Sequence, residues 1–175
     1  MATNTFTPPA VRTEPTARRI RVRAGDAVVA DSRRATLLVE YGPGRLPTYL
    51  LPDDDVDTAL AADLGRRIGD DGPEGTEGLW TFPWDGSVSW FEEAIEVVVH
   101  ARDPKHRVDA LPSDRHVVVE IAGEVVADSR APHAVFETHL PIRWYLPMED
   151  VRQELLVPSD LVTSCPYNGT ARYWS

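Results

Sequence analysis

Residues 28–33 read VVADSR, and the same six letters recur at residues 125–130, 97 positions later. The agreement continues beyond this hexapeptide. Glu40 and Glu137 stand at the same offset, and LPTYLLPDDDV (46–56) corresponds to LPIRWYLPMEDV (140–151). Identical letters in register, followed by the same order of motifs, indicate an internal duplication. The 175-residue chain is therefore predicted to hold two small, related units.

Both copies show the patterns of β-strands. RRIRVRAGDAVVADS (18–32) and HVVVEIAGEVVADS (116–129) contain β-rich runs on either side of a glycine-containing turn, which predicts a hairpin in each copy. A third strand (ATLLVEY and HAVFETH) and a fourth (TYLL and RWYL) are expected next, at residues 35–41, 133–139, 48–51 and 143–146.

Acidic runs follow the fourth strand of each copy, at residues 53–69 and 148–156. Carboxylates are favourable at helix N-termini, so both runs predict short helical turns. In the first copy the period of the apolar residues extends this prediction to a helix through Val56, Leu60, Leu64 and Ile68.

Composition excludes several classes of function. The net charge of −10 disfavours binding to nucleic acid and to an anionic membrane surface. The single cysteine excludes an internal disulfide and a multi-cysteine zinc site, and the five histidines lack metal-binding spacing, so no metal is expected. No apolar leader or membrane-length segment occurs, which predicts a cytoplasmic protein.

The two copies are unequal. The second ends in CPYNG (165–169) and YWS (173–175), whereas the first runs through GLWTFPWDG (78–86) and a connector to the second. Phe82-Pro83-Trp84 is either a diverged counterpart of Cys-Pro-Tyr or unrelated to it. We therefore expect a functional site, if present, in the second copy.

The motifs of the second copy resemble those of a known bacterial family, domain of unknown function 427, sometimes labelled nucleotidyltransferase-like. The resemblance is carried by ADS, Glu137, RWYLP, DV, CPY-G and YWS, at residues 127–129, 137, 143–147, 150–151, 165–169 and 173–175. Asn168 stands where the family has lysine, and the first copy lacks the CPY-G motif. The family also continues beyond YWS, so the resemblance implies that the second repeat is truncated at its C-terminus.

The resemblance implies a mainly β fold of two tandem, small β-tent-like (Mss4-like) repeats with short helical turns. We expect a disordered tail at 1–16, a degenerate first repeat with its connector at 17–103, and an incomplete second repeat at 104–175. Relatives of this architecture often carry zinc on paired CxxC motifs. This sequence has none, so no structural zinc is expected.

Cys165 is the candidate catalytic residue. Pro166 restricts it to an extended conformation, which could present the thiol on a turn as a nucleophile. The alternative is a small buried or turn residue without chemical function.

A ligand site is predicted around Glu137, Arg143, Tyr145, Tyr167 and Asn168. Arg143 and Tyr145 are two residues apart on one strand and therefore share a face. With Glu137 and Tyr167 they could line a polar pocket with an aromatic wall, suited to a small planar or anionic ligand. The alternative is a cross-strand ion pair between Arg143 and Glu137. The recurring Asp-Ser-Arg (31–33 and 128–130) is interpreted as a structural turn, because Asp and Ser bond local backbone amides.

The favoured function is binding of a small polar or anionic ligand by the second repeat. Two alternatives stay open: an enzyme that uses Cys165 or transfers nucleotidyl groups, and a structural or partner-binding protein. Whether the chain is an enzyme, and which cofactor it would use, cannot be inferred from the residues. An open sheet edge could also support an oligomer.

Overall fold

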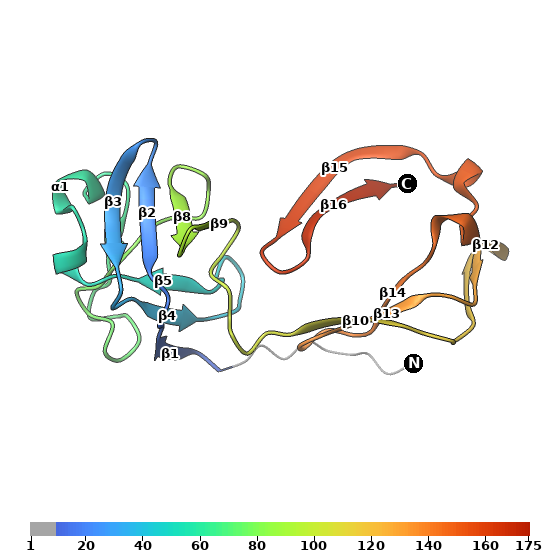
Figure 1. Cartoon of the computed structure of the whole chain (residues 1–175), viewed down its shortest axis with the longest axis horizontal. Helices are drawn as coiled ribbons and strands as arrows, with labels where there is room; N and C mark the ends of the chain where they lie inside the picture. The colour runs from blue at the N-terminus through green and yellow to red at the C-terminus, as the bar shows by residue number, and fades with distance from the viewer. Residues whose placement is uncertain (1–9) are drawn as a thin grey trace. The chain divides into compact units, whose positions relative to one another are not determined.

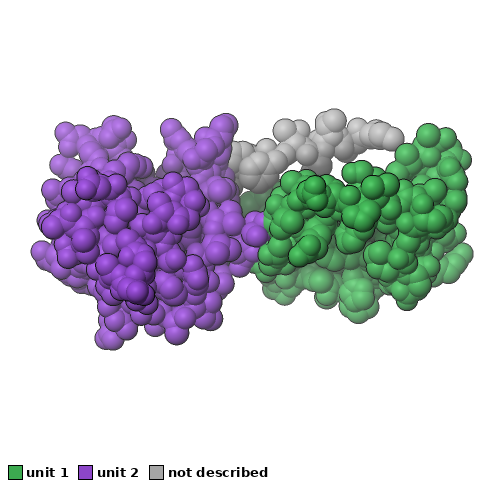
Figure 2. Space-filling model, turned by 90° about the horizontal axis from the view of Figure 1, so that it is seen from above, with its two compact units in different colours: residues 1–7, 104–163, 167–175 green, residues 8–103, 164–166 purple. Residues whose placement is uncertain are grey.

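The two VVADSR segments become the second strands of two matching hairpins in the computed structural model, which describes residues 10–175 (Figure 1). The chain forms two compact units, coloured purple and green in Figure 2. The N-terminal unit runs to Asp103 and includes residues 164–166. The C-terminal unit comprises Pro104–Thr163 and Tyr167–Ser175.

The N-terminal unit is built mostly from short antiparallel strands. Its sheets have the orders β1-β4-β5, β3-β2-β8-β9 and β6-β7. The elements are β1 (Arg12–Pro15), β2 (Ile20–Ala24), β3 (Ala27–Ser32), β4 (Thr36–Val39), β5 (Thr48–Leu50), η1 (Asp53–Asp55), α1 (Thr58–Ala61), β6 (Arg66–Arg67), β7 (Trp80–Thr81), β8 (Ser89–Glu92) and β9 (Ile95–Val97).

The C-terminal unit repeats the first part of this order. Its sheets are β10-β13-β14, β11-β12 and β15-β16. The elements are β10 (Val108–Pro112), β11 (Val117–Ile121), β12 (Glu124–Ser129), β13 (His133–Glu137), β14 (Arg143–Tyr145), η2 (Met148–Asp150), η3 (Gln153–Leu155), β15 (Pro158–Cys165) and β16 (Gly169–Trp174).

Strand register confirms the duplication. Asp31 pairs with Arg21 in the β2–β3 hairpin, and Asp128 pairs with Val118 in β11–β12, each partner again 97 residues later. Both hairpins shift register at the same step, after Val22 and after Val119. The β1–β4 and β10–β13 pairs also match residue for residue. The mainly β fold and the tandem repeat are thus confirmed, and the tent-like architecture stays a prediction.

The N-terminal unit has a well-packed core centred on Trp90 of β8. This ring stacks on Trp84, with centroids 4.8 Å apart and planes at 10°, and meets the Phe82 ring edge-on at 5.9 Å. Ile20 and Val22 of β2 are fully buried in the same cluster. The segment Phe82–Trp84 therefore supplies core aromatic residues.

Two sequence-based expectations are wrong in this unit. The helix predicted at 53–69 is reduced to the single turn α1, capped by Asp57, whose Oδ1 accepts hydrogen bonds from the backbone of Ala59 and Leu60 at 3.1 and 3.2 Å. Beyond α1 the chain turns at Gly65, where a Cβ would lie 2.7 Å from the Phe82 ring, so tertiary packing overrides the apolar period. The disordered tail predicted at 1–16 includes an ordered strand, β1, at residues 12–15. Residues 1–9 of this tail lie outside the described part of the chain.

The serine of each Asp-Ser-Arg bonds a local backbone amide as predicted, whereas the aspartates do not: Asp31 bonds Arg19 and Asp128 bonds His116 across their hairpins. Ser32 and Ser129 are buried, and each hydroxyl accepts a hydrogen bond from the backbone two residues on, at 3.0 Å from Arg34 and 3.3 Å from Ala131. Helices in the described chain are short, and none has the length and apolar character needed to cross a membrane.

Candidate functional site

Glu137 is the centre of a polar cluster in the C-terminal unit. It ends β13 opposite Val108 of β10, while Arg143 of β14 lies opposite Val135, so the alternation of strand side chains puts both on one face. The guanidinium of Arg143 forms an ion pair with Oε2 of Glu137. The carboxylate is nearly buried (7% exposed), whereas the Arg143 side chain is 42% exposed.

Residues from two other segments reach the same carboxylate. His106, in the connector before β10, places Nε2 2.8 Å from Oε1 of Glu137. The side-chain amide of Asn168, in the turn between β15 and β16, donates to Oε2 at 3.4 Å. Tyr167 of that turn lies against the imidazole of His106, with ring centroids 4.3 Å apart. The cluster thus combines one carboxylate, a partly exposed guanidinium and an aromatic wall.

The structure brings together four of the predicted ligand-site residues, Glu137, Arg143, Tyr167 and Asn168. Tyr145 is two residues beyond Arg143 on β14, opposite His133, and is exposed. Cys165 ends β15, is half-buried and falls in the other compact unit, so its role as a nucleophile stays a prediction.

Sequence reasoning missed His106. The residue stands in the segment ARDPKHRVD, which reads only as a connector between the copies. Val108, two residues after His106, pairs with Glu137 across β10 and β13, and this pairing brings His106 beside Glu137. An antiparallel pairing of the connector with the third strand would have been the only available signal.

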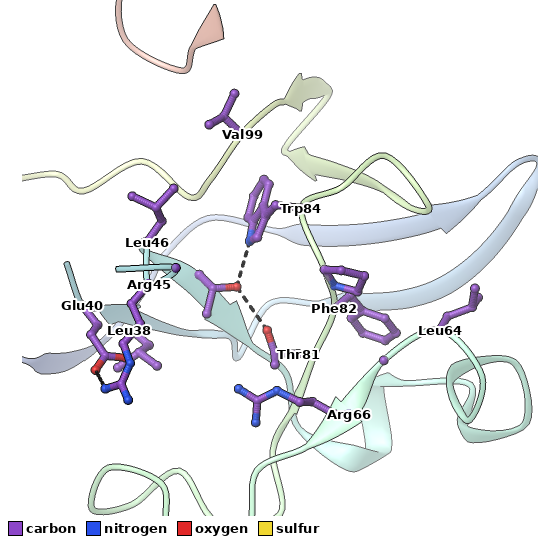
Figure 3. A pocket seen from close by; sticks show the side chains of 14 residues that line it. Leu38, Glu40, Arg45, Leu46, Leu64, Arg66, Thr81, Phe82, Trp84 and Val99 are labelled. Atoms are coloured by element: carbon purple, nitrogen blue, oxygen red, sulfur yellow. Dashed lines mark hydrogen bonds and ion pairs between the residues drawn. The ribbon is translucent and has the colours of Figure 1, made fainter. Parts of the chain in front are cut away.

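The N-terminal unit contains a cavity of about 560 Å³, which the sequence did not predict (Figure 3). Thr48 accepts a hydrogen bond from Nε1 of Trp84 at 3.0 Å and shares another with Thr81 at 3.1 Å, both drawn in Figure 3. Glu40 pairs with Arg45 at 2.5 Å on one side of the cavity. Arg66 adds another guanidinium, and the remaining lining is largely apolar, including Leu38, Leu46, Leu64, Phe82 and Val99.

The cavity and the polar cluster occupy equivalent places in the two repeats. Glu40 and Glu137 are 97 residues apart and directly follow or end matching strands. Thr48 faces Leu38 across the β4–β5 pair, as Arg143 faces Val135 across β13–β14, so Thr48 and Arg143 are counterparts. Each repeat therefore gives this glutamate an arginine partner, from the loop before β5 in one case and from β14 itself in the other.

A smaller cavity of about 430 Å³ lies in the C-terminal unit, beside β12 and η2. Its lining is acidic, with Asp128, Glu149, Asp150 and Glu154, and Arg152 is its only cation. Within residues 10–175, no group of three or more His, Cys, Asp and Glu side chains is arranged to hold a metal ion.

Comparison with known proteins gives one finding at the level of family. The family model described as Domain of unknown function (DUF427) matches residues 12–68 and 109–175, one segment in each repeat. No curated protein and no solved structure matches the chain.

Proposed function

The chain belongs to the DUF427 family, and on this premise we propose that it binds a small anionic ligand at the Glu137 cluster of its C-terminal unit. The observation that carries the proposal is the nearly buried carboxylate of Glu137, which holds His106, Arg143 and Asn168 from three separate segments. A carboxylate removed from water must be compensated by donors, and the donors it gathers become fixed in space.

Arg143 is the ligand-binding group in this proposal. A guanidinium has five N–H donors, and Glu137 fixes its orientation through one of its nitrogen atoms. The side chain is 42% exposed, so its outward donors are accessible to a carboxylate or phosphate group. The ring of Tyr167, tilted by 31° against the His106 imidazole, offers an aromatic surface for an attached planar group.

The N-terminal repeat supports a ligand site at this place in the fold. Its equivalent glutamate, Glu40, lines the cavity of about 560 Å³ together with Arg45 and Arg66. That volume lies within the range of about 300–1,000 Å³ that is common for small-molecule sites. The cavity is therefore the second place at which an anion with an apolar portion would be sought.

A thermal-shift panel tests the proposal. The full chain is melted with inorganic phosphate, citrate, AMP, and ATP with and without magnesium, each at millimolar concentration. A ligand that binds only the folded state raises the melting temperature. We expect at least one anion to do so, with the shift abolished in Arg143→Gln and retained in Arg130→Gln, which changes an exposed arginine next to β12.

Two further variants, Arg45→Gln and Arg66→Gln, distinguish binding in the cavity of the N-terminal unit from binding at the Glu137 cluster in the same panel. A shift lost in these variants and kept in Arg143→Gln assigns the ligand to the cavity and refutes the Glu137 cluster. Wild-type chain that shows no shift with any of these anions contradicts the proposed function.

A further inference from the structure

A row of polar side chains from three strands lines the cavity of the N-terminal unit. Arg66 of β6 lies directly opposite Thr81 of β7, so the two side chains share one face of this strand pair. The Thr81 hydroxyl in turn shares a hydrogen bond with the hydroxyl of Thr48 on β5, at 3.1 Å. All three residues line the cavity of about 560 Å³. The strand pairing therefore places one guanidinium and two hydroxyl groups next to one another in the cavity.

The two hydroxyl groups retain one unused hydrogen-bond donor. Thr48 accepts a hydrogen bond from Nε1 of Trp84 at 3.0 Å and shares one bond with Thr81. Two hydroxyls carry two protons, and the bond between them uses only one. Residues 10–175 supply no acceptor for the other proton. Thr81 is only 5% exposed, and a buried donor without an acceptor is costly, so an oxygen atom of a ligand in the cavity would satisfy this donor.

The charged groups of the lining leave one guanidinium without a carboxylate. Glu40 pairs with Arg45. Arg66, on the exposed strand β6, forms no ion pair with any residue in the described part of the chain. In Figure 3 its side chain extends from β6 toward the side of the cavity on which Glu40 and Arg45 lie. Two arginines and one glutamate give the lining a net charge of one positive unit, which suits a monoanion, because Glu40 would repel the second charge of a dianion.

The rest of the lining is mostly apolar and includes a residue with a strained backbone. Val99, labelled in Figure 3, has a φ of 74°. The backbone N–H of His100 donates to the carbonyl of Val98 at 2.9 Å, so Val99 is the central residue of a γ-turn of the rare, strained kind. A β-branched residue seldom adopts a positive φ, and such strained residues are concentrated at ligand sites. The strain at Val99 therefore supports a binding role for the cavity that this residue lines.

We propose that this cavity binds an apolar monocarboxylate, that is, an aliphatic or aromatic acid with a single negative charge. The carboxylate accepts hydrogen bonds from the guanidinium of Arg66 and from the unused hydroxyl proton of the Thr48–Thr81 pair. The hydrocarbon part of the ligand lies against the apolar lining, where the burial of its surface supplies affinity. The cavity and the Glu137 cluster lie in different units and take different classes of ligand, so either site can exist without the other.

Calorimetry of the full chain with phenylbutyrate and with octanoate tests the proposal. We expect saturable binding of at least one of the two acids. The corresponding amides, phenylbutyramide and octanamide, keep the hydrocarbon part and carry no charge, so they should bind at least about tenfold more weakly. Because this comparison changes only the ligand, it does not depend on the folding of any variant.

Two neighbouring arginines provide a matched pair of variants. Arg66→Gln removes the guanidinium opposite Thr81 and should weaken the binding of the acid at least about tenfold. Arg67 is the next residue on β6, so its side chain points to the other face of the strand, where it pairs with Asp53 at 3.3 Å. Arg67→Gln removes the same charge from the same strand and should bind the acid as the wild type does.

Glu40→Gln tests the match of charge. This substitution frees Arg45 and raises the net charge of the lining to two positive units. Phenyl phosphate is a dianion at about pH 8, since the second pKa of such a group is about 6. It should therefore bind Glu40→Gln more tightly than it binds the wild type.

Four results would overturn the proposal. They are no binding of either acid at millimolar concentration, equal binding of the acids and their amides, equal weakening by Arg66→Gln and Arg67→Gln, and loss of acid binding in Arg143→Gln but not in Arg66→Gln. The last result assigns the acid to the Glu137 cluster. Equal affinity of phenyl phosphate for Glu40→Gln and for the wild type contradicts the selection of a monoanion by the charges of the lining.

Discussion

Glu137 and Glu40 occupy equivalent positions in the two repeats, and the structure predicts that the same substitution will affect them differently. Glutamine keeps the shape of glutamate and removes its charge. In Glu137→Gln, the amide oxygen can still accept a hydrogen bond from Arg143, but the negative charge that pairs with the guanidinium is lost. In Glu40→Gln, the ion pair with Arg45 is lost.

The size of each effect follows from burial. A hydrogen bond to a charged group contributes about 1.5–3 kcal/mol. Arg143 is 42% exposed and can regain water when the carboxylate is lost, so Glu137→Gln should cost about one such bond, about 2 kcal/mol. Glu40 and Arg45 are 22% and 66% exposed, and an exposed pair of this kind contributes about 0–1 kcal/mol.

Hydrogen exchange of the full chain measures both effects, because amides in β13 and β4 report on the two units separately. A loss of about 2 kcal/mol makes the protected amides of β13 exchange about 30-fold faster, since 1.4 kcal/mol is tenfold. Those of β4 should change by less than about fivefold in Glu40→Gln. Equal effects of the two substitutions, or an effect of Glu137→Gln no larger than that of Glu40→Gln, would refute the assignment of Glu137 as the buried centre of the cluster.

Three further predictions concern residues outside this pair. If Cys165 is a nucleophile, iodoacetamide at neutral pH should alkylate it faster than it alkylates a cysteine in an unfolded peptide, and an equal or slower rate contradicts the role. The hydrogen bond from Arg19 lowers the pKa of Asp31, so this carboxylate stabilises the fold above the ordinary carboxyl pKa, and that stability is lost as pH falls through the lowered value. The melting temperature of Asp31→Asn should therefore fall less steeply in acid than that of the wild type. Trp90→Ala should destabilise the N-terminal unit by about 3–5 kcal/mol in urea denaturation, and a cost below 1 kcal/mol would contradict its place at the centre of the core.

The duplication, the strands and most of the polar cluster could be predicted because they depend on residues that are close together in the sequence. VVADSR repeats as text, alternating residues predict strands, and Glu137 and Arg143 are six residues apart on consecutive strands. The failures arise where contacts between distant segments decide the outcome. The apolar period of 53–69 predicts a helix, but Gly65 packs against Phe82, 17 residues later, and the chain turns there instead. His106 joins the cluster through the pairing of β10 with β13, and no short sequence motif predicts that pairing.

One pair of equivalent positions explains how the repeats came to differ at the candidate site. In the N-terminal unit the position is Thr48, whose hydroxyl is engaged by Thr81 and by the indole of Trp84, and this strand faces a cavity whose lining includes Phe82 and Trp84. In the C-terminal unit it is Arg143, whose guanidinium is held by the nearly buried Glu137 and is partly exposed to solvent. Threonine satisfies its hydrogen bonds inside the protein, whereas the guanidinium has donors left for a solute. An arginine at this position therefore replaces an internal hydrogen-bonded wall with a partly exposed guanidinium, the group to which we propose that an anion binds, while the register of the surrounding strands stays the same.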